Sequence, residues 1–193
     1  MTRLRFKTPR LTLREFTRAD RAEWARVHEV SEAFFAPWMP SRPDGLTHAQ
    51  RFDVDYPKWI ADAHDDRHYR VGGFDSGGRL VVLIGLNNNA RGVFQNTDMG
   101  WRVSAERARQ GFGKEGVIGA LTLAFAPQPA GLGLHRVQAN IIPANSPSVA
   151  LAHAVGFRKE GTARRLLQIA GVWQDHEMYA ITADEFHPAF GMP

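Results

Sequence analysis

The chain of 193 residues contains no cysteine. This absence excludes a disulfide-stabilised scaffold, a thiolate zinc site and a cysteine nucleophile. No apolar run approaches the roughly 20 residues of a membrane-spanning helix. Residues 1–7 also lack the apolar core of a secretory signal peptide. We therefore expect a cytoplasmic protein that has no membrane association.

Internal repeats and low-complexity linkers are absent as well. With 193 residues, of which 44% are hydrophobic and 23% charged, the chain has the composition of one globular domain with a sizeable core. We therefore expect a single domain over residues 1–193. The formal net charge of +4 fits a solvated basic surface, an anionic ligand or a partner bound to nucleic acid, and it does not separate these possibilities.

Hydrophobic periodicity predicts the secondary structure. Alternation predicts strands at residues 10–16, 68–74, 79–86, 94–103, 135–142, 166–170 and 177–181. Helical spacing predicts helices capped by Asp20 and over residues 47–63, 114–126 and 148–155, with Gly156 ending the last one and Pro57 interrupting the second. Turns, breaks or frayed ends are expected at residues 31–43, 75–78, 87–92, 127–129 and 186–193.

This order of elements predicts a mixed α+β domain, in which an antiparallel meander leads into a βαβ crossover and a terminal hairpin. A sheet that changes from antiparallel to parallel pairing must splay or twist where its two halves meet. We therefore expect an opening in the sheet beside the crossover.

Residues 98–125 predict a strand, a glycine-bearing loop and a helix. The loop and the helix start carry three basic residues and two glycines, namely Arg107, Arg109, Gly111, Gly113 and Lys114. Unpaired N–H groups and the positive end of the helix dipole make such a loop a phosphate site. We expect its glycines to let the backbone come close to the ligand.

Glycine spacing alone leaves the phosphate ligand open. A nucleotide-binding P-loop would need a hydroxyl residue after Lys114, but Glu115 stands there. Gly111, Gly113 and Gly116 fit the G-x-G-x-x-G pattern of dinucleotide-binding folds, yet no acidic residue follows the downstream strand.

Three ordered motifs resemble the GNAT N-acetyltransferase superfamily. Residues 108–113 fit its pyrophosphate loop, Q/R-x-x-G-x-G/A, except that the first residue is alanine. Asn145 and Ser148 fit its N-x-x-S motif. Residues 156–176 and 8–14 resemble the RimJ/RimL-like branch, which acetylates protein N-termini and has relatives that act on small amines. Since that loop binds pyrophosphate mainly through backbone N–H groups, the alanine changes little.

The resemblance implies a three-layer α+β fold, with helices on both faces of a mixed, mostly antiparallel sheet that splays near Val103 to receive the pantetheine arm. It implies direct acetyl transfer from acetyl-CoA to an amine, since no cysteine is present to carry the acetyl group. Its partners would be acetyl-CoA and a protein N-terminus or a small amine such as a polyamine or aminoglycoside, without direct nucleic-acid contact, in a monomer or homodimer. The implied acetyl-CoA contacts are Trp101, Val103, Arg109, Gln110, Gly111, Phe112, Gly113, Lys114, Asn140, Asn145 and Ser148.

The same resemblance implies catalytic roles. Asp98 stands where many members carry the acid that takes the amine proton, and a surface aspartate without a role is the alternative. Glu106 is a second candidate, nearer the loop. Ser148 would protonate the leaving thiolate or serve only as a helix N-cap. Asn145 would bind pantetheine or be a turn residue, and a backbone N–H near Val103 would stabilise the oxyanion.

In the family, residues 31–63 form one wall of the acceptor cleft. Trp38, Met39 and Trp59 are the candidates for acceptor contact, with core packing as the alternative for the tryptophans. His64 and His68 lie four apart but lack the H-E-x-x-H glutamate, so no metal site is expected.

The rival to an enzyme is a module that binds CoA without turnover. A module of this kind needs no base near the thiol, so Asp98 and Ser148 favour the enzyme.

Overall fold

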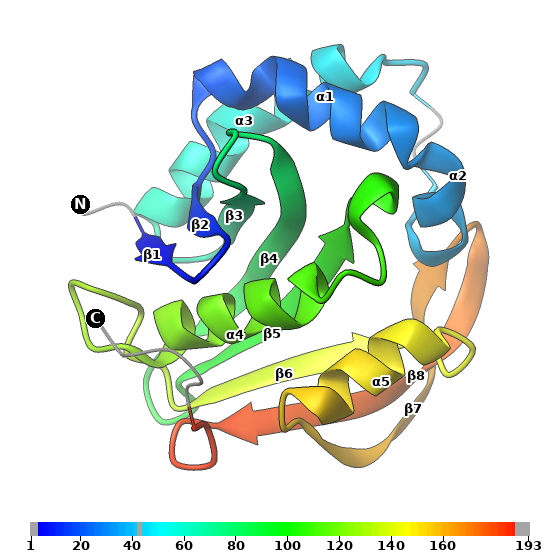
Figure 1. Ribbon diagram of the computed structural model, residues 1–193. Helices are drawn as coiled ribbons and strands as arrows, with labels where there is room; N and C mark the ends of the chain where they lie inside the picture. Colours follow the sequence, from blue (N-terminus) through cyan, green and yellow to red (C-terminus); the bar gives the residue numbers. More distant parts are fainter. Residues whose placement is uncertain (1–3, 42–43, 188–193) are drawn as a thin grey trace.

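The computed structural model describes residues 4–41 and 44–187. These residues form an eight-stranded mixed sheet in the order β1-β2-β3-β4-β5-β6-β8-β7 (Figure 1). β5 and β6 pair in parallel, and the other neighbouring strands pair antiparallel. The strands are β1 (Arg5–Lys7), β2 (Thr12–Glu15), β3 (Tyr69–Phe74), β4 (Leu80–Ala90), β5 (Asn96–Val103), β6 (Arg136–Ile141), β7 (Arg158–Ile169) and β8 (Val172–Thr182).

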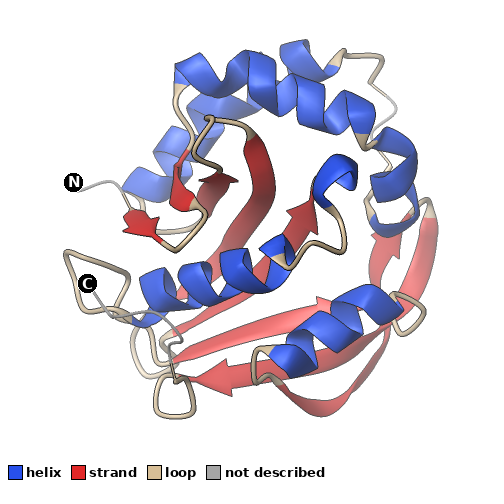
Figure 2. Ribbon diagram, in the orientation of Figure 1, coloured by secondary structure: helices blue, strands red, loops and turns tan. Residues whose placement is uncertain are grey.

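Helices cover both faces of the sheet (Figure 2). They are α1 (Arg21–Val30), α2 (Glu32–Phe35), α3 (His48–His64), α4 (Phe112–Phe125) and α5 (Ser146–Ala154), with the 3₁₀ turns η1 (Arg18–Asp20), η2 (Ala36–Trp38) and η3 (Ala105–Arg107). Helices α4 and α5 belong to one hydrophobic cluster, and α1, α2 and α3 belong to a second one on the other face. The expected mixed sheet between two helical layers is confirmed. No helix in the described ranges is long and apolar enough to span a membrane.

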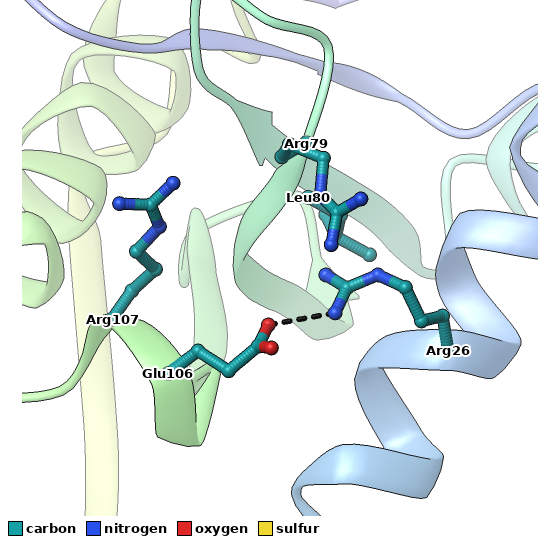
Figure 3. Close-up of a pocket in the computed structure, with 5 residues that line it drawn as sticks. All are labelled: Arg26, Arg79, Leu80, Glu106 and Arg107. Carbon is teal, nitrogen blue, oxygen red and sulfur yellow. Dashed lines mark hydrogen bonds and ion pairs between the residues drawn. The ribbon is translucent and has the colours of Figure 1, made fainter.

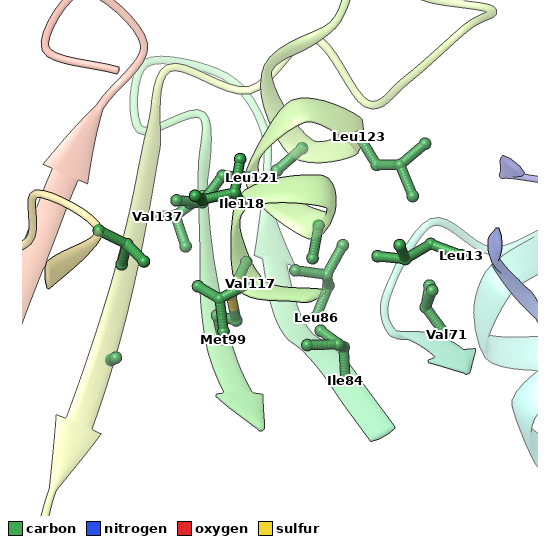
Figure 4. Packing of buried hydrophobic residues seen from close by; sticks show 14 of the residues in the cluster. Leu13, Val71, Ile84, Leu86, Met99, Val117, Ile118, Leu121, Leu123 and Val137 are labelled. Carbon is green, nitrogen blue, oxygen red and sulfur yellow. The ribbon is translucent and has the colours of Figure 1, made fainter. Parts of the chain in front are cut away.

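Helix α4 forms the centre of the larger core (Figure 4). Its side chains are buried on nearly every side, and Val117, Leu121 and Leu123 are fully enclosed. The strand side chains labelled around it are Leu13, Val71, Ile84, Leu86, Met99 and Val137. This continuous burial explains why α4 carries almost no charge beyond its first turn.

Two glycines bring α4 unusually close to the sheet. A Cβ built on Gly116 would lie 2.9 Å from Val82, and one on Gly119 would lie 2.9 Å from Leu13. Both distances are too short for a real side chain, so these glycines are required by helix–sheet packing. The third glycine of the G-x-G-x-x-G pattern is therefore a packing residue.

A second cluster fills the space between α1, α3 and strands β3 and β4. It contains an aromatic group in which the ring of Trp59 lies 5.4 Å from Phe52 and 5.9 Å from Trp24. Helix α3 runs unbroken through Pro57, contrary to the expected interruption. Buried Phe52 before the proline and buried Ala63 after it anchor the helix on both sides of the missing hydrogen bond.

The turn expected at residues 87–92 comes later in the chain, at Gly92 and Val93. β4 continues to Ala90, with Asn87 opposite Asp98, and a register shift follows before Ala90 pairs with Asn96. Asn88 adopts φ +54° within this irregular segment. Asparagine tolerates that left-handed conformation, so a run that favours a turn locally is held in the ladder by its pairing with β5.

Other boundaries also differ from expectation. Residues 31–43 contain α2 and η2, and β7 and β8 are much longer than the predicted strands at 166–170 and 177–181. Asp20 accepts hydrogen bonds from Thr17 in a capping box around η1, so it leads into α1 rather than capping it directly. Phe186 is buried against Phe125, and the rest of the expected frayed end, residues 188–193, lies outside the described residues.

The sheet opens where its two halves meet. β5 and β6 pair at three positions, the last of which joins Asp98 to Gln138. Beyond that pair the two strands diverge, as their arrows in Figure 1 show. The splay expected near Val103 is present, and it begins five residues earlier in β5.

Candidate active site

The loop before α4 presents an anion site at the helix start. Gly111 is the N-cap and has φ +80°, a left-handed conformation that favours glycine. The first intrahelical hydrogen bond runs from Glu115 N to Gly111 O at 3.2 Å. The N–H groups of Phe112, Gly113 and Lys114 precede it, and they can donate to an anion at the positive end of the helix dipole. The loop therefore fits a pyrophosphate group.

Arg10 braces this loop from the N-terminal segment. Its Nε donates to Glu115 at 2.6 Å, its Nη1 donates to the carbonyl of Gln110 at 3.0 Å, and its guanidinium lies 4.1 Å from the centre of the Phe112 ring. Burial opposes ionisation of Glu115, but hydrogen bonds from Thr8 and Arg10 outweigh it and hold the pKa of this carboxyl below its ordinary value. Arg10 thus neutralises a carboxylate that would otherwise repel an anion at the helix start.

A second group of arginines lies near the loop but is already paired. A hollow of about 300 Å³ between α1, the start of β4 and η3 is lined by Arg26, Arg79, Leu80, Glu106 and Arg107 (Figure 3). The ion pairs around it are Arg26–Glu106 at 2.6 Å, Arg79–Glu23 at 3.4 Å and Arg107–Asp75 at 3.4 Å. We interpret the hollow as an ion-pair network that ties η3 to α1. The hydrogen bond from Arg26 lowers the pKa of Glu106, which makes Glu106 a poor proton acceptor.

An apolar surface leads from the loop into the splay. The partly buried side chains along it are Trp101, Val103, Val149 and Leu151. A Cβ on Gly113 would lie 3.1 Å from Val103 and 3.2 Å from Leu151. Strand β5, α4 and α5 therefore converge at Gly113, where a larger residue would press on both side chains.

One edge of β5 is available beside this apolar surface. From Met99 to Val103 the strand pairs with β4, and no described strand pairs with its other edge. Backbone N–H and C=O groups on that edge can bind an extended ligand as a neighbouring strand would. This region thus combines an anion site, apolar side chains and an unpaired strand edge, which suits an elongated ligand with a phosphate group.

Asn145, and not Ser148, caps helix α5. The helix begins at Ser146, and the Asn145 side-chain oxygen accepts a hydrogen bond from Ser148 N at 3.3 Å. The cap alternative for Ser148 is therefore wrong, because its backbone N–H is the capped group. Ser148 is partly buried one turn before Leu151, on the helix that contributes to the apolar surface.

Asp98 lies where the splay begins. Its side chain is on the face of the sheet opposite to Trp101 and Val103. Gln138 Nε2 donates to Asp98 Oδ1 at 2.6 Å, and Asn88 Nδ2 donates to Oδ2 at 3.0 Å. The side-chain amide of Asn87 donates to the backbone carbonyl of Asp98 at 3.1 Å and so fixes β5 at this position. Both carboxylate oxygens are thus oriented by amide donors from the two neighbouring strands.

Two glycines lie beside Asp98 on this face. Gly85 and Gly100 are direct partners across β4 and β5, and we call them the glycine patch. Arg70 is the partner of Gly85 on β3, and its Nη1 donates to Asn87 at 2.6 Å. Two residues beyond Gly100, Arg102 occupies the same face. Asp98, Arg70 and Arg102 are thus charged side chains on the face that carries the glycine patch.

The family model for the Acetyltransferase (GNAT) domain matches residues 10–158. The chain belongs to the GNAT acetyltransferase family. YjcK of Bacillus subtilis, a probable N-acetyltransferase, is 34% identical over 117 residues, which are 60% of this chain and 62% of that protein. The ribosomal protein uS5-alanine N-acetyltransferase of Escherichia coli is 26% identical over 96% of this chain and 94% of its own length.

Solved structures share the fold. Mycobacterium smegmatis RimJ, in complex with CoA-disulfide, has a TM-score of 0.82 and 27% identity, with 91% of this chain and 83% of that chain covered. Spermidine N-acetyltransferase from Vibrio cholerae, in complex with CoA and spermine, has a TM-score of 0.75 and 21% identity over 92% of this chain and 98% of that chain. This GNAT protein is therefore an N-acetyltransferase by family.

In this acetyltransferase the predicted acceptor residues fall into two groups. Trp59 is part of the aromatic packing described above, which favours the core alternative. Met39 O accepts a hydrogen bond from Ala170 N at 3.1 Å, so the end of η2 touches the turn between β7 and β8. Trp38 precedes it and is partly exposed. The segment around Met39 and the turn between β7 and β8, which are far apart in the sequence, thus meet beside the face of the sheet that carries Asp98.

Asn140 is set apart from the other predicted cofactor residues. It alternates in β6 with Ala139 and Ile141, which are buried under α4 and α5. Asn140 therefore lies on the Asp98 face, next to Gln138 in the pattern of alternation. A direct cofactor role would require the ligand to reach through the splay.

Several site residues escaped sequence reasoning. Gln138 and Asn88 hold Asp98, but their proximity depends on a parallel register and on a strand that was expected to be a turn. The alternation of Asp98, Gly100 and Arg102 along β5 was a usable signal for the glycine patch. Among the described residues, no group of three His, Cys, Asp or Glu side chains could hold a metal ion.

Proposed function

We propose that this protein transfers an acetyl group from acetyl-CoA to the N-terminal α-amine of a protein. The observation that carries the choice of acceptor is the charge around the glycine patch, where Asp98 shares one face of the sheet with Arg70 and Arg102. One carboxylate suits one ammonium group, whereas a polyamine would bring further positive charges towards two guanidinium groups. Similarity to the uS5-alanine acetyltransferase over 96% of the chain supports the same acceptor class.

The residues present fit acetyl-CoA. The N–H groups of Phe112, Gly113 and Lys114 would bind its pyrophosphate, with Arg109 and Gln110 from the same loop beside them, and the apolar surface with Trp101 and Val103 would contact its pantetheine arm. When bound, acetyl-CoA supplies the activated acetyl group.

Each step then has a candidate group on this chain. Asp98, oriented by Gln138 and Asn88, accepts the proton of the acceptor ammonium, directly or through water. An N–H on the unpaired edge of β5 near Val103 stabilises the oxyanion. The Ser148 hydroxyl donates a proton to the leaving thiolate. Asp98 and Ser148 lie on opposite faces of the sheet, so the two substrates would meet at the splay from two sides.

Intact-mass analysis of acceptors incubated with acetyl-CoA tests the proposal. The panel contains peptides with a free α-amine, the same peptides with a blocked N-terminus and a free lysine, spermidine and an aminoglycoside. We expect acetylation of the free α-amine only. Acetylation of spermidine or the aminoglycoside without any peptide product would replace the proposed acceptor with a small amine, the class on which the spermidine acetyltransferases act.

A module that binds CoA without turnover is the remaining alternative. It predicts acetyl-CoA binding by calorimetry with no acetylated product from any acceptor. Product formation that depends on Asp98 excludes it.

A further inference from the structure

Within the glycine patch, Gly100 has no explanation in the protein itself. Gly100 is exposed although β5 is an interior strand, and a Cβ built on it would have nothing within 4 Å. Its φ is not in the left-handed region, so its conformation does not call for glycine. This contrasts with Gly113, Gly116 and Gly119, at each of which a Cβ would make close contacts within the protein. Valine or threonine would be the usual residue on a strand.

A missing side chain in open space permits close approach of a ligand backbone. The exposed surface at Gly100 has defined ends, because Asp98 and Arg102 flank this glycine on the same face of β5. They lie four residues apart along β5, or roughly 13 Å at the rise of a strand. An extended peptide covers the same span with about four residues. Because the unprotonated amine must form at Asp98, the chain would run from there towards Arg102.

Arg102 is held in place for such a contact. His28 is buried, and its Nδ1 lies 2.8 Å from the carbonyl of Trp24, which requires that nitrogen to donate. The other ring nitrogen, Nε2, therefore accepts from Arg102 Nη1 at 3.0 Å. The guanidinium also lies 5.4 Å from the centre of the Phe35 ring. A fixed guanidinium attracts carbonyl and carboxylate oxygens, which a peptide carries and a polyamine does not.

We infer that Gly100 is a specificity-determining residue on which the first residues of the acceptor peptide lie in extended conformation, with the α-amine at Asp98 and an oxygen of the acceptor at Arg102. The inference rests on the proposed function and adds the position and direction of the peptide. The missing Cβ at Gly100 would be the feature that admits main chain at this place.

The test is the substitution Gly100→Val, with Gly161→Val as matched control. Gly161 is also a strand glycine with nothing within 4 Å of a built Cβ, but it lies on β7, three places from β5 in the sheet. Valine suits a strand, so both variants should fold. We expect Gly100→Val to lower kcat/KM for a peptide acceptor by roughly 10²-fold. Thermal melting and the calorimetric affinity for acetyl-CoA should match the wild type. Gly161→Val should leave all three measurements unchanged.

The outcomes separate the inference from the proposed function. One outcome is that the wild type acetylates peptides and that Gly100→Val has the same kcat/KM for them as Gly161→Val. The proposed acceptor class would then be correct, but the peptide would not lie on Gly100. If the wild type acetylates small amines but no peptide, both are wrong. Arg102→Gln provides a second measurement, for which we expect a higher KM for peptides with little change for a single small amine. An equal change for both acceptors would overturn the contact with Arg102.

Discussion

Arg10 and Glu115 are 105 residues apart in the chain, and their side chains meet at 2.6 Å directly behind the anion-binding turn. The contact joins the segment before β2 to the first turn of α4, and Arg10 also donates to the carbonyl of Gln110 within the loop. The N-terminal segment thus fixes the loop that would bind the phosphates.

Arg10→Gln should weaken acetyl-CoA binding. The loop loses its brace, and the carboxylate of Glu115 loses the charge that compensates it near the bound phosphates. We expect Kd by calorimetry to rise on the order of tenfold, corresponding to about 1.4 kcal/mol. Arg21→Gln, which breaks an exposed ion pair with Asp53, is the control and should leave Kd unchanged. An unchanged Kd in Arg10→Gln would mean that the loop is held without the brace.

Glu115 should contribute stability that depends on pH. Since folding lowers the pKa of Glu115, its ionised form stabilises the protein above the ordinary value of 4.5, and this contribution disappears as the pH falls through the lower folded value. Urea unfolding of Glu115→Gln should therefore show a deficit of about 1–3 kcal/mol at neutral pH, which shrinks as the pH falls below 4.5. The variant Glu29→Gln, at an exposed position on α1, should follow the wild type. A deficit that persists unchanged at low pH would contradict the role of ionised Glu115.

Asp98→Asn should remove the proton acceptor and keep its shape. The amides of Asn88 and Gln138 can rotate to match the new amide, so we expect a normal melting temperature and acetyl-CoA affinity. Turnover should fall by roughly 10²-fold or more. Glu106→Gln, at the second candidate base, should keep wild-type turnover. Full activity of Asp98→Asn would move the proton acceptor to another group or to solvent.

The cap of α5 and the chemistry of Ser148 can be tested separately. Asn145→Ala removes the cap and should cost about 1 kcal/mol of stability. Ser148→Ala keeps the backbone N–H that is capped, so its melting temperature should stay close to that of the wild type. Its turnover should fall if the hydroxyl protonates the thiolate. Steady-state rates and thermal melts on both variants distinguish the roles, and normal turnover in Ser148→Ala would remove it from the reaction.

Local sequence patterns were sufficient for the order of elements and for the position of the glycine-bearing loop before α4. The meander, the crossover and the start of α4 depend on hydrophobic periodicity and on glycine within a few residues, and these are readable from the chain. The residue that caps α5 could not be read from the chain, because Asn145 and Ser148 are both good capping residues three positions apart.

The remaining site depends on contacts between distant segments. Asn88 was expected in a turn because asparagine runs favour turns, yet its neighbour Asn87 pairs with β5. Gln138 reaches Asp98 only through the parallel register of β5 and β6. Gly113 and Gly116 looked like ligand-binding glycines, although their own contacts are with Val103 and Val82. None of these relationships is encoded within a single window of sequence.

Only three residue pairs join β5 to β6, so we expect the two halves of the sheet to behave as separate units in local opening. We expect strands β6, β7 and β8 to exchange their amide hydrogens as a group while β2 to β5 stay closed. A ligand in the splay would touch both units, so its binding energy would also oppose their separation. Amide hydrogen exchange in β6 and β8 should therefore slow when acetyl-CoA is added, including at positions that the ligand does not contact.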